Sequence, residues 1–129
     1  MARKKIIYSI LLSFLTQFSN ILIAQDDFIP PPGFEFNQSR YQNFYLFDSG
    51  DIDGANLEEG DWIASFTPDG NICVGSWPWQ GQFTQLAAMG DDGSVWTQGY
   101  LLEGQFPSFK VYDASANVIY VATVSENHA

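Results

Sequence analysis

The side chains of this sequence that could do chemistry are mostly acidic or aromatic, because thiol and imidazole groups are almost absent. The 129 residues include fifteen Asp and Glu, one Cys and one His. The acids gather in a dense stretch from Asp48 to Asp61 and in the loop Gly90-Asp91-Asp92-Gly93. Calcium prefers about six to eight oxygen ligands on a flexible backbone. One hypothesis is therefore a calcium site drawn from Asp48, Asp51, Asp53, Asp91 and Asp92.

The spacing of these acids does not fit the EF-hand loop. If Asp51 is the first ligand, Asn56 stands where the motif requires glycine. If Ser49 is the first ligand, Gly60 stands where the motif requires glutamate. Asp also favours tight turns, because its carboxylate accepts hydrogen bonds from nearby backbone N–H groups. Solvated turn chemistry is therefore the alternative to calcium for the same residues.

Aromatic side chains are the second excess. Seventeen Phe, Trp and Tyr residues follow position 33, whereas a small core holds about ten such rings. Trp77, Trp79, Gln80 and Trp96 fall at expected strand ends or in loops. Flat rings can stack on sugar rings while neighbouring amides bind hydroxyls, so these four residues are the candidate carbohydrate-binding site. The alternative is that the tryptophans cap the core, since large aromatic side chains are usually buried.

The sequence does not favour catalysis. His128 is next to the last residue, where chains fray, so no base oriented by a third group is available. One His and one Cys cannot form a zinc site, and no phosphate loop or nucleophile elbow occurs. We therefore expect a protein that is not an enzyme.

Cys73, between Ile72 and Val74, is either a buried apolar side chain or a reactive thiol that pairs with a partner.

The first 25 residues have the anatomy of a secretory signal peptide. Basic residues at positions 3–5 precede an apolar run from Ile6 to Leu15, and the small Ala24 marks a cleavage site. The alternative is a transmembrane anchor, which needs about 20 predominantly apolar residues, but polar residues at 17, 19 and 20 interrupt this run. We expect residues 1–24 to be removed and the protein to be secreted or held at the cell surface.

Removal of this leader makes the remaining chain strongly acidic. Arg40 and Lys110 then stand against all fifteen acids, which gives a formal net charge of −13. A body of that charge repels nucleic-acid phosphates and anionic lipid headgroups. Nucleic acid is therefore excluded as a partner, and so is a membrane surface after the leader is cleaved.

The pattern of the remaining chain predicts an all-β protein. Short runs rich in aromatic and β-branched residues alternate with Gly, Asp, Asn and Pro, without a sustained helical period. We expect an antiparallel β-sandwich, immunoglobulin-like or jelly-roll-like, of about seven strands over residues 34–125. Residues 25–33, with three consecutive prolines, are expected to form an N-terminal arm, and residues 126–129 a frayed tail. The expected strands are 41–47, 61–66, 72–77, 83–89, 95–102, 109–113 and 118–124.

Two turns are predicted more locally. The segment TPDGN at 67–71 combines Pro, Asp and Gly in the order that favours a tight turn, so the strands on either side form a hairpin. In FKVYD, residues 109 and 111 alternate with Lys110 and Tyr112, which is typical of a half-buried antiparallel strand. A short turn at Ala116-Asn117 then returns the chain.

Five blocks follow one another along the chain: FEFNQS at 34–39, GDWIASF at 60–66, NICVG at 71–75, GDDG at 90–93 and FKVYDAS at 109–115. Their order resembles a module of secreted bacterial proteins that is often repeated in large surface proteins ending in a sorting domain. The resemblance covers about residues 34–120. It implies an immunoglobulin-like sandwich with an accessory, adhesive or structural role and no catalysis. Only one module and no sorting domain are visible, so the chain is either released or retained by a partner, or it is part of a longer product.

Two functions are consistent with these features. The first is a non-catalytic extracellular binding or adhesion module that recognises a polysaccharide or another surface polymer through its loop aromatics. The second is a structural subunit of an extracellular assembly, in which the arm from Asp26 to Phe36 pairs with the sheet edge of a neighbour. The partner is then an extracellular polysaccharide, a surface protein or another copy of the chain.

Overall fold

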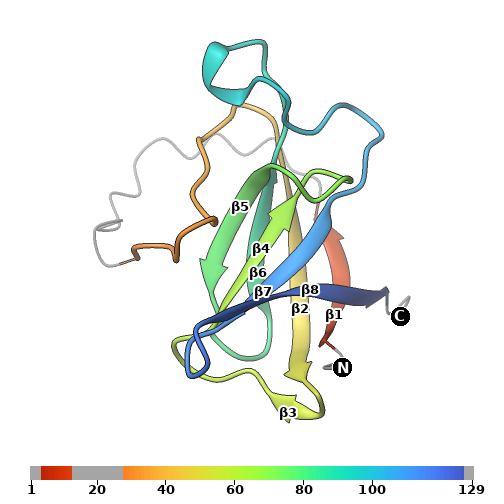
Figure 1. Ribbon diagram of the computed structural model, residues 1–129. Helices are drawn as coiled ribbons and strands as arrows, with labels where there is room; N and C mark the ends of the chain where they lie inside the picture. Colours follow the sequence, from red (N-terminus) through yellow and green to blue (C-terminus); the bar gives the residue numbers. More distant parts are fainter. Residues whose placement is uncertain (1–3, 13–27, 127–129) are drawn as a thin grey trace.

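The computed structural model describes residues 4–12 and 28–126, and strands dominate it (Figure 1). The predicted cleavage site at Ala24, the start of the arm and residues 127–129 of the predicted tail lie outside the described residues. The helical element of the described part is a short 3-10 turn, η2 (Val95–Thr97). The strands are β1 (Lys4–Leu12), β2 (Gln42–Ile52), β3 (Ala55–Asn56), β4 (Trp62–Phe66), β5 (Cys73–Pro78), β6 (Thr84–Met89), β7 (Ser108–Asp113) and β8 (Val118–Glu126).

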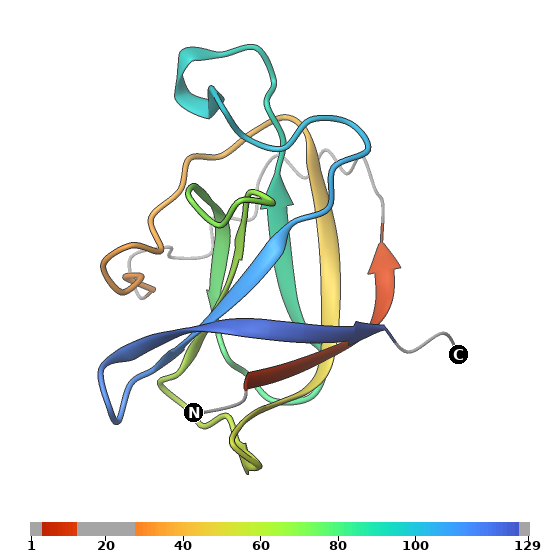
Figure 2. The same ribbon diagram turned by 45° about the vertical axis from the view of Figure 1, so that its right-hand side comes forward.

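Strands β2 to β8 form two antiparallel sheets, which confirms the predicted sandwich. One sheet has the order β3-β2-β6 and the other the order β5-β4-β7-β8. Strand β1 lies between the two sheets, antiparallel to β2 and parallel to β8 (Figure 2). With β1 in place, the strands form one continuous eight-stranded arrangement.

One of the expected strands is absent. The apolar residues of segment 95–102 predict a strand, but Val95–Thr97 is the 3-10 turn η2, and Leu101 makes only an isolated bridge to Gly90. Side chains hold this loop instead: the Thr97 hydroxyl donates to Asp92 Oδ1 at 2.7 Å and accepts from the Asp92 backbone N–H at 3.1 Å. Such local hydrogen bonds compete with a strand ladder, so the prediction for this segment is wrong.

Both predicted turns are confirmed. In the β4–β5 turn, Gly70 has a φ of +78°, which favours glycine, and Asp69 Oδ1 accepts from the Asn71 backbone N–H at 3.0 Å. In the β7–β8 turn, Asn117 adopts a φ of +52°, a conformation that Asn tolerates better than most residues. Both hairpins are antiparallel, as expected.

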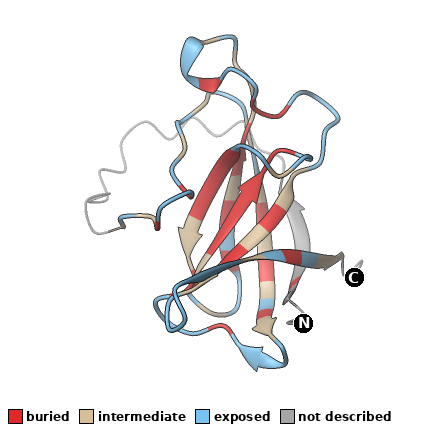
Figure 3. Cartoon of the chain, viewed as in Figure 1, coloured by how far each residue is buried: buried red, intermediate tan, exposed pale blue. Residues whose placement is uncertain are grey.

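The main core lies between the two sheets. Figure 3 shows buried residues running along β4 and β5 in the middle of the molecule. The alternation predicted for β7 is present, because Phe109 and Val111 are buried while Lys110 and Tyr112 are half-buried. The buried members of this core are Ile6, Tyr45, Phe47, Leu57, Ile63, Val74, Trp79, Leu86, Ala88, Met89, Tyr100, Leu101, Phe109, Val111 and Ala122.

The two sheets approach each other closely where β5 meets β6. A Cβ atom added at Gly75 would overlap the carbonyl oxygen of Ala87, so only glycine fits at this position. Ser65 on β4 joins the same contact, since its hydroxyl donates to the Ala87 carbonyl at 2.7 Å. This contact fixes the distance between the sheets on one side, while β1 joins them on the other.

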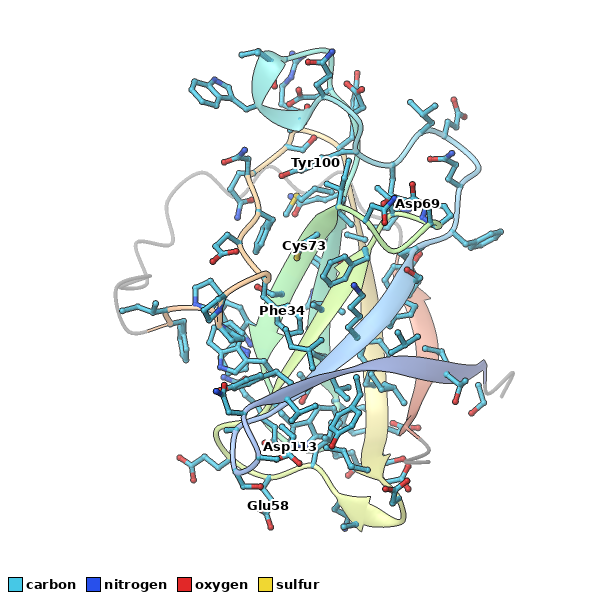
Figure 4. The ribbon with its side chains drawn as sticks, in the orientation of Figure 1. Phe34, Glu58, Asp69, Cys73, Tyr100 and Asp113 are labelled. Atoms are coloured by element: carbon cyan, nitrogen blue, oxygen red, sulfur yellow. The ribbon has the colours of Figure 1, made fainter. Side chains whose placement is uncertain are left out.

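A second, smaller core lies on the outer face of β4 and β5, under residues 28–39, which we call the N-terminal arm in the structure. Its buried members are Phe34, Ala64, Phe66 and Cys73. Figure 4 shows Phe34 reaching from the arm toward the sheet that carries Cys73. Strand β4 is therefore covered on both faces, which explains why four consecutive residues of it, from Ile63 to Phe66, are buried.

Candidate functional site

The candidate site is a groove where the N-terminal arm crosses the outer face of β4 and β5. It has a volume of about 280 Å³. The residues that line it come from three segments: Phe28, Pro30, Glu35, Phe36 and Gln38 from the arm, Trp62 from β4, and Ser76 and Trp77 from β5. Four of these eight residues carry aromatic rings, and most of the others carry polar side chains. Small-ligand sites are usually lined in this way, by aromatic side chains with a few polar groups.

The arm is held in place by a tight turn and a buried anchor. The Phe34 backbone N–H donates to the Pro31 carbonyl at 3.0 Å, and Gly33 between them has a φ of +97°. The Phe34 ring is fully buried and meets Phe66 edge to face, with centroids 5.9 Å apart. The Ser76 hydroxyl donates to the Phe34 carbonyl at 2.9 Å. These contacts fix the arm on the sheet without a strand ladder, which leaves room for a groove beside it.

Further along, the arm is tied to the loop that follows β6. The Asn37 backbone N–H donates to the Tyr100 hydroxyl at 2.8 Å, and the Asn37 amide donates to the Trp96 carbonyl at 2.9 Å. The Ser39 hydroxyl donates to the Gly90 carbonyl at 2.6 Å. Tyr100 is buried at this junction (Figure 4). The groove wall formed by the arm is therefore fixed at both of its ends.

The rings in the groove are half-buried, so each keeps an accessible surface. Phe28 and Trp77 lie against each other with centroids 5.0 Å apart and planes tilted by 42°. Phe36 and Trp62 are also half-buried. Within the described part of the chain, the indole N–H groups of Trp62 and Trp77 make no hydrogen bond. Both indoles can therefore offer a ring surface and a donor to a ligand.

The polar groups of the groove are a carboxylate and an amide. Glu35 is exposed and accepts the Gly33 backbone N–H at 2.9 Å through Oε2, so it has a fixed orientation and remaining acceptor capacity. The exposed Gln38 amide makes no hydrogen bond to any described residue. Ring faces with a nearby carboxylate and amide are suited to sugars, which present apolar C–H surfaces and hydroxyls together.

The four residues predicted to bind carbohydrate do not form one site in the structure. Trp77 lines the groove. Trp79 is only 7% exposed and belongs to the main core, so its ring has almost no surface for stacking. Trp96 is 70% exposed on η2 but does not line the groove. Gln80 is exposed after β5, where its backbone N–H donates to the Thr84 hydroxyl at 3.0 Å.

Asp91 and Asp92, predicted as metal ligands, make the hydrogen bonds of a folded loop. Asp91 Oδ1 accepts from the Gly93 backbone N–H at 2.9 Å. The carboxylate of Asp92 accepts from Thr97, from the Ser94 backbone N–H at 3.0 Å and from the Arg40 backbone N–H at 3.1 Å. Hydrogen bonds, first of all from Thr97, hold the pKa of Asp92 well below its ordinary value.

The acids near β2 are separated from that loop. Asp51 Oδ2 accepts from the Gly54 backbone N–H at 2.8 Å, and Asp53 has a φ of +53° in the same turn. Asp48, within β2, has a buried Oδ1 without a hydrogen-bond partner in the described chain. Residues 4–12 and 28–126 contain no group of three or more His, Cys, Asp or Glu side chains placed to hold a metal ion. The geometry of the described acids fits turn chemistry, the alternative to calcium.

Other acids also accept hydrogen bonds that stabilise turns, at or near the two hairpins. Asp69 accepts from the Thr67 hydroxyl at 2.6 Å, and Asp113 accepts from the Ser115 hydroxyl at 2.7 Å (Figure 4). Asp61 is buried and accepts from the backbone N–H groups of Glu58 and Ala114, at 2.8 and 2.9 Å. These bonds tie the loop before β4 to the β7–β8 turn.

Cys73 lies in the outer core and is 7% exposed. Burial raises the pKa of its thiol to about 11. Since the thiolate is the reactive species, this side chain is unsuited to chemistry or to pairing with a partner in the folded protein. The structure thus favours the interpretation of Cys73 as a buried apolar residue.

Sequence reasoning missed most of the groove. Trp62 directly precedes the buried Ile63, so strand alternation could have placed its ring on the outer face of β4. Phe28, Glu35, Phe36 and Gln38 reach the groove only because the arm folds back over the sheet. No local pattern signals that contact, since it joins residues far apart in the chain.

A larger groove of about 740 Å³ lies at the loop end of the molecule. It runs between the start of β2, the end of β6 and residues 101–105. Tyr41 supplies the one aromatic ring in its lining, and Gly90 and Gly104 contribute only backbone. The smaller groove has the denser set of rings and is therefore the stronger candidate.

Comparisons with known proteins assign no family to this chain, so we classify it by its fold. No protein-family model matches this chain, and neither a curated protein nor a solved structure matches it. By its fold, the described part of the chain is a small all-β domain of two antiparallel sheets. No helix within the described ranges has the length and apolar character needed to span a membrane.

Proposed function

We propose that this protein is a non-catalytic extracellular binding or adhesion module that holds a neutral polysaccharide in the groove under its N-terminal arm. The observation that carries the proposal is the set of half-buried rings, Phe28, Phe36, Trp62 and Trp77, beside the exposed Glu35 and Gln38. Secretion or display at the cell surface is part of the proposal and rests on the leader-like sequence of residues 1–24.

The negative charge of the chain favours a neutral polysaccharide over an anionic one as the ligand. The processed chain has a formal charge of −13, and Glu35 places a carboxylate in the groove itself. Anionic polymers such as those made of uronic acids are repelled by such a surface. Neutral hexose or pentose polymers avoid this repulsion and still present hydroxyls to Glu35 and Gln38.

The alternative function, an assembly in which the arm adds to the sheet of a neighbour, has less support. Residues 28–39 of the arm already cover the outer face of their own sheet, and Phe34 is fully buried there. An arm used for assembly would have to give up that anchor. The finer assignment as an immunoglobulin-like module of bacterial surface proteins remains a prediction.

Affinity electrophoresis in gels that contain xylan, mixed-linkage β-glucan, mannan or polygalacturonate tests the proposal. The native chain should be retarded by a neutral polymer and not by polygalacturonate. Trp77→Ala and Trp62→Ala should each remove most of the retardation, because each deletes one stacking surface. Trp96→Ala is the matched control, since it removes an exposed indole outside the groove. Retardation that survives both groove substitutions and is lost with Trp96→Ala would contradict the proposal.

A further inference from the structure

Strand β1 lies between the edge of β2 in one sheet and the edge of β8 in the other. On one side it pairs with β2 from Ile52 to Phe44, and on the other with β8 from Thr123 to Glu126. The side chain of Ile6 is completely buried in the main core. Without β1, the backbone groups of these two strand edges and the position of Ile6 would be open.

The same nine residues, Lys4–Leu12, belong to the segment whose sequence predicts a cleaved leader. A basic start followed by an apolar run suits export, and an apolar run of this length also suits a buried strand. If residues 1–24 are removed during export, the protein loses the strand that joins its two sheets. Exposed strand edges readily pair with another chain, so the processed protein would present an acceptor site.

The fit of β1 in this space is imperfect, which favours exchange. The ladder between β1 and β2 has two register shifts, and these leave Asp48 on β2 and Ser9 on β1 without a partner residue. The ladder between β2 and β6 runs through six consecutive pairs without a shift. Bulges disrupt ladder hydrogen bonds, and the unpartnered Asp48 Oδ1 lies at one of these shifts.

We infer that the space between β2 and β8 is a strand-acceptor site, and that after loss of the leader it receives an apolar β-strand from another protein. The donor strand runs antiparallel to β2 and parallel to β8, as β1 does. It carries a large apolar side chain at the position of Ile6. Main-chain hydrogen bonds to two edges supply affinity, and the pocket for that side chain supplies specificity.

This inference goes beyond the proposed carbohydrate groove and does not need sugar binding, but it rests on the loss of the leader that the proposed function includes. The groove lies on β4, β5 and the arm, whereas the acceptor site is formed by β2 and β8. A failure of polysaccharide binding would leave the acceptor site untouched, and the reverse also holds.

The test uses the full chain and a synthetic peptide with the sequence of residues 4–12, KKIIYSILL. Ile6→Asp should expel β1 from its place, because a carboxylate at a fully buried position is not tolerated. The peptide should then bind the Ile6→Asp chain saturably in titration calorimetry and raise its melting temperature. Binding to the unsubstituted chain should be at least about tenfold weaker, because its acceptor site is occupied.

Ile29→Asp is the matched control, since Ile29 is 83% exposed. The peptide should bind this variant no better than the unsubstituted chain. A peptide that itself carries Ile6→Asp should not bind any of the chains. If Ile6→Asp unfolds the chain, the unmodified peptide should restore the near-UV circular dichroism of the folded state.

The direction of the bound peptide provides a separate readout. A spin label at the peptide N-terminus should broaden the amide signal of Ile52, and a label at its C-terminus should broaden that of Phe44. An Ile6→Asp chain that stays folded without binding the peptide would overturn the inference. So would an unfolded Ile6→Asp chain that the peptide does not restore, or equal binding to all three chains.

Discussion

The two faces of strand β4 are both buried, but they are covered in different ways. The inner face, with Ile63 and Ser65, meets the opposite sheet in the main core. The outer face, with Ala64 and Phe66, lies under an arm that has no strand ladder with it. A cover without a ladder can leave a gap beside it, and the candidate groove opens there, next to Trp62.

Phe47 lies in the main core on the inner side of β4, and Phe34 lies under the arm on the outer side. The two can be compared directly, because both rings are fully buried and both meet another Phe edge to face. Phe47→Ala should be the most destabilising substitution at either face. It leaves a cavity between two sheets that cannot collapse, so we expect a loss of about 4 kcal/mol in the free energy of unfolding. Urea denaturation measures this loss. A cost equal to or below that of Phe34→Ala would contradict the difference between the two faces.

Phe34→Ala should cost less, about 2 kcal/mol, because the arm can lift away instead of leaving a rigid void. It should also expose Cys73 beneath the arm. The thiol pKa of Cys73, which burial raises to about 11, should then fall toward its ordinary value of 9.0, and labelling by a thiol reagent at pH 8 should accelerate. The Phe47→Ala variant is the control, since it should leave labelling of the folded state slow. Equal labelling of both variants would show that the arm does not protect this face.

Asp92→Asn should have the smallest effect, because Asp92 stabilises a loop outside both faces of β4. Its pKa is held low by hydrogen bonds, so its contribution to stability is present above the ordinary value of 3.8 and is lost as the pH falls below it. The variant should melt slightly below the unsubstituted protein at pH 7, and the difference should shrink toward pH 2. Melting curves over this pH range provide the measurement, and a difference that grows in acid would contradict the assignment.

Six of the seven expected strands and both turns were predictable because their signals are local. The Pro, Asp and Gly of the β4–β5 turn act within a few residues, and the Asp69 carboxylate bonds there as expected. The segment 95–102 was not predictable from its apolar residues, because the Asp92 and Thr97 side chains stabilise a loop in place of a strand. Composition could not reveal that competition.

The candidate site was only partly predictable. An excess of aromatic residues correctly implied that some rings stay accessible, but it could not separate the buried Trp79 from the half-buried Trp77, two positions apart. The remaining groove residues depend on how the arm folds back, which is a contact between distant segments. Residues 4–12 illustrate a further limit, since one apolar run satisfies the pattern of a leader and that of the buried strand β1.

The most direct test of the groove is a nitrogen–proton correlation spectrum of the four indole N–H groups, recorded during titration with the neutral polymer that retards the protein best. Single Trp→Phe variants assign the four signals. We expect the signals of Trp62 and Trp77 to shift in a saturable manner, while those of Trp79 in the core and Trp96 on the loop stay in place. A shift confined to Trp96, or no shift in any of the four signals, would contradict the account.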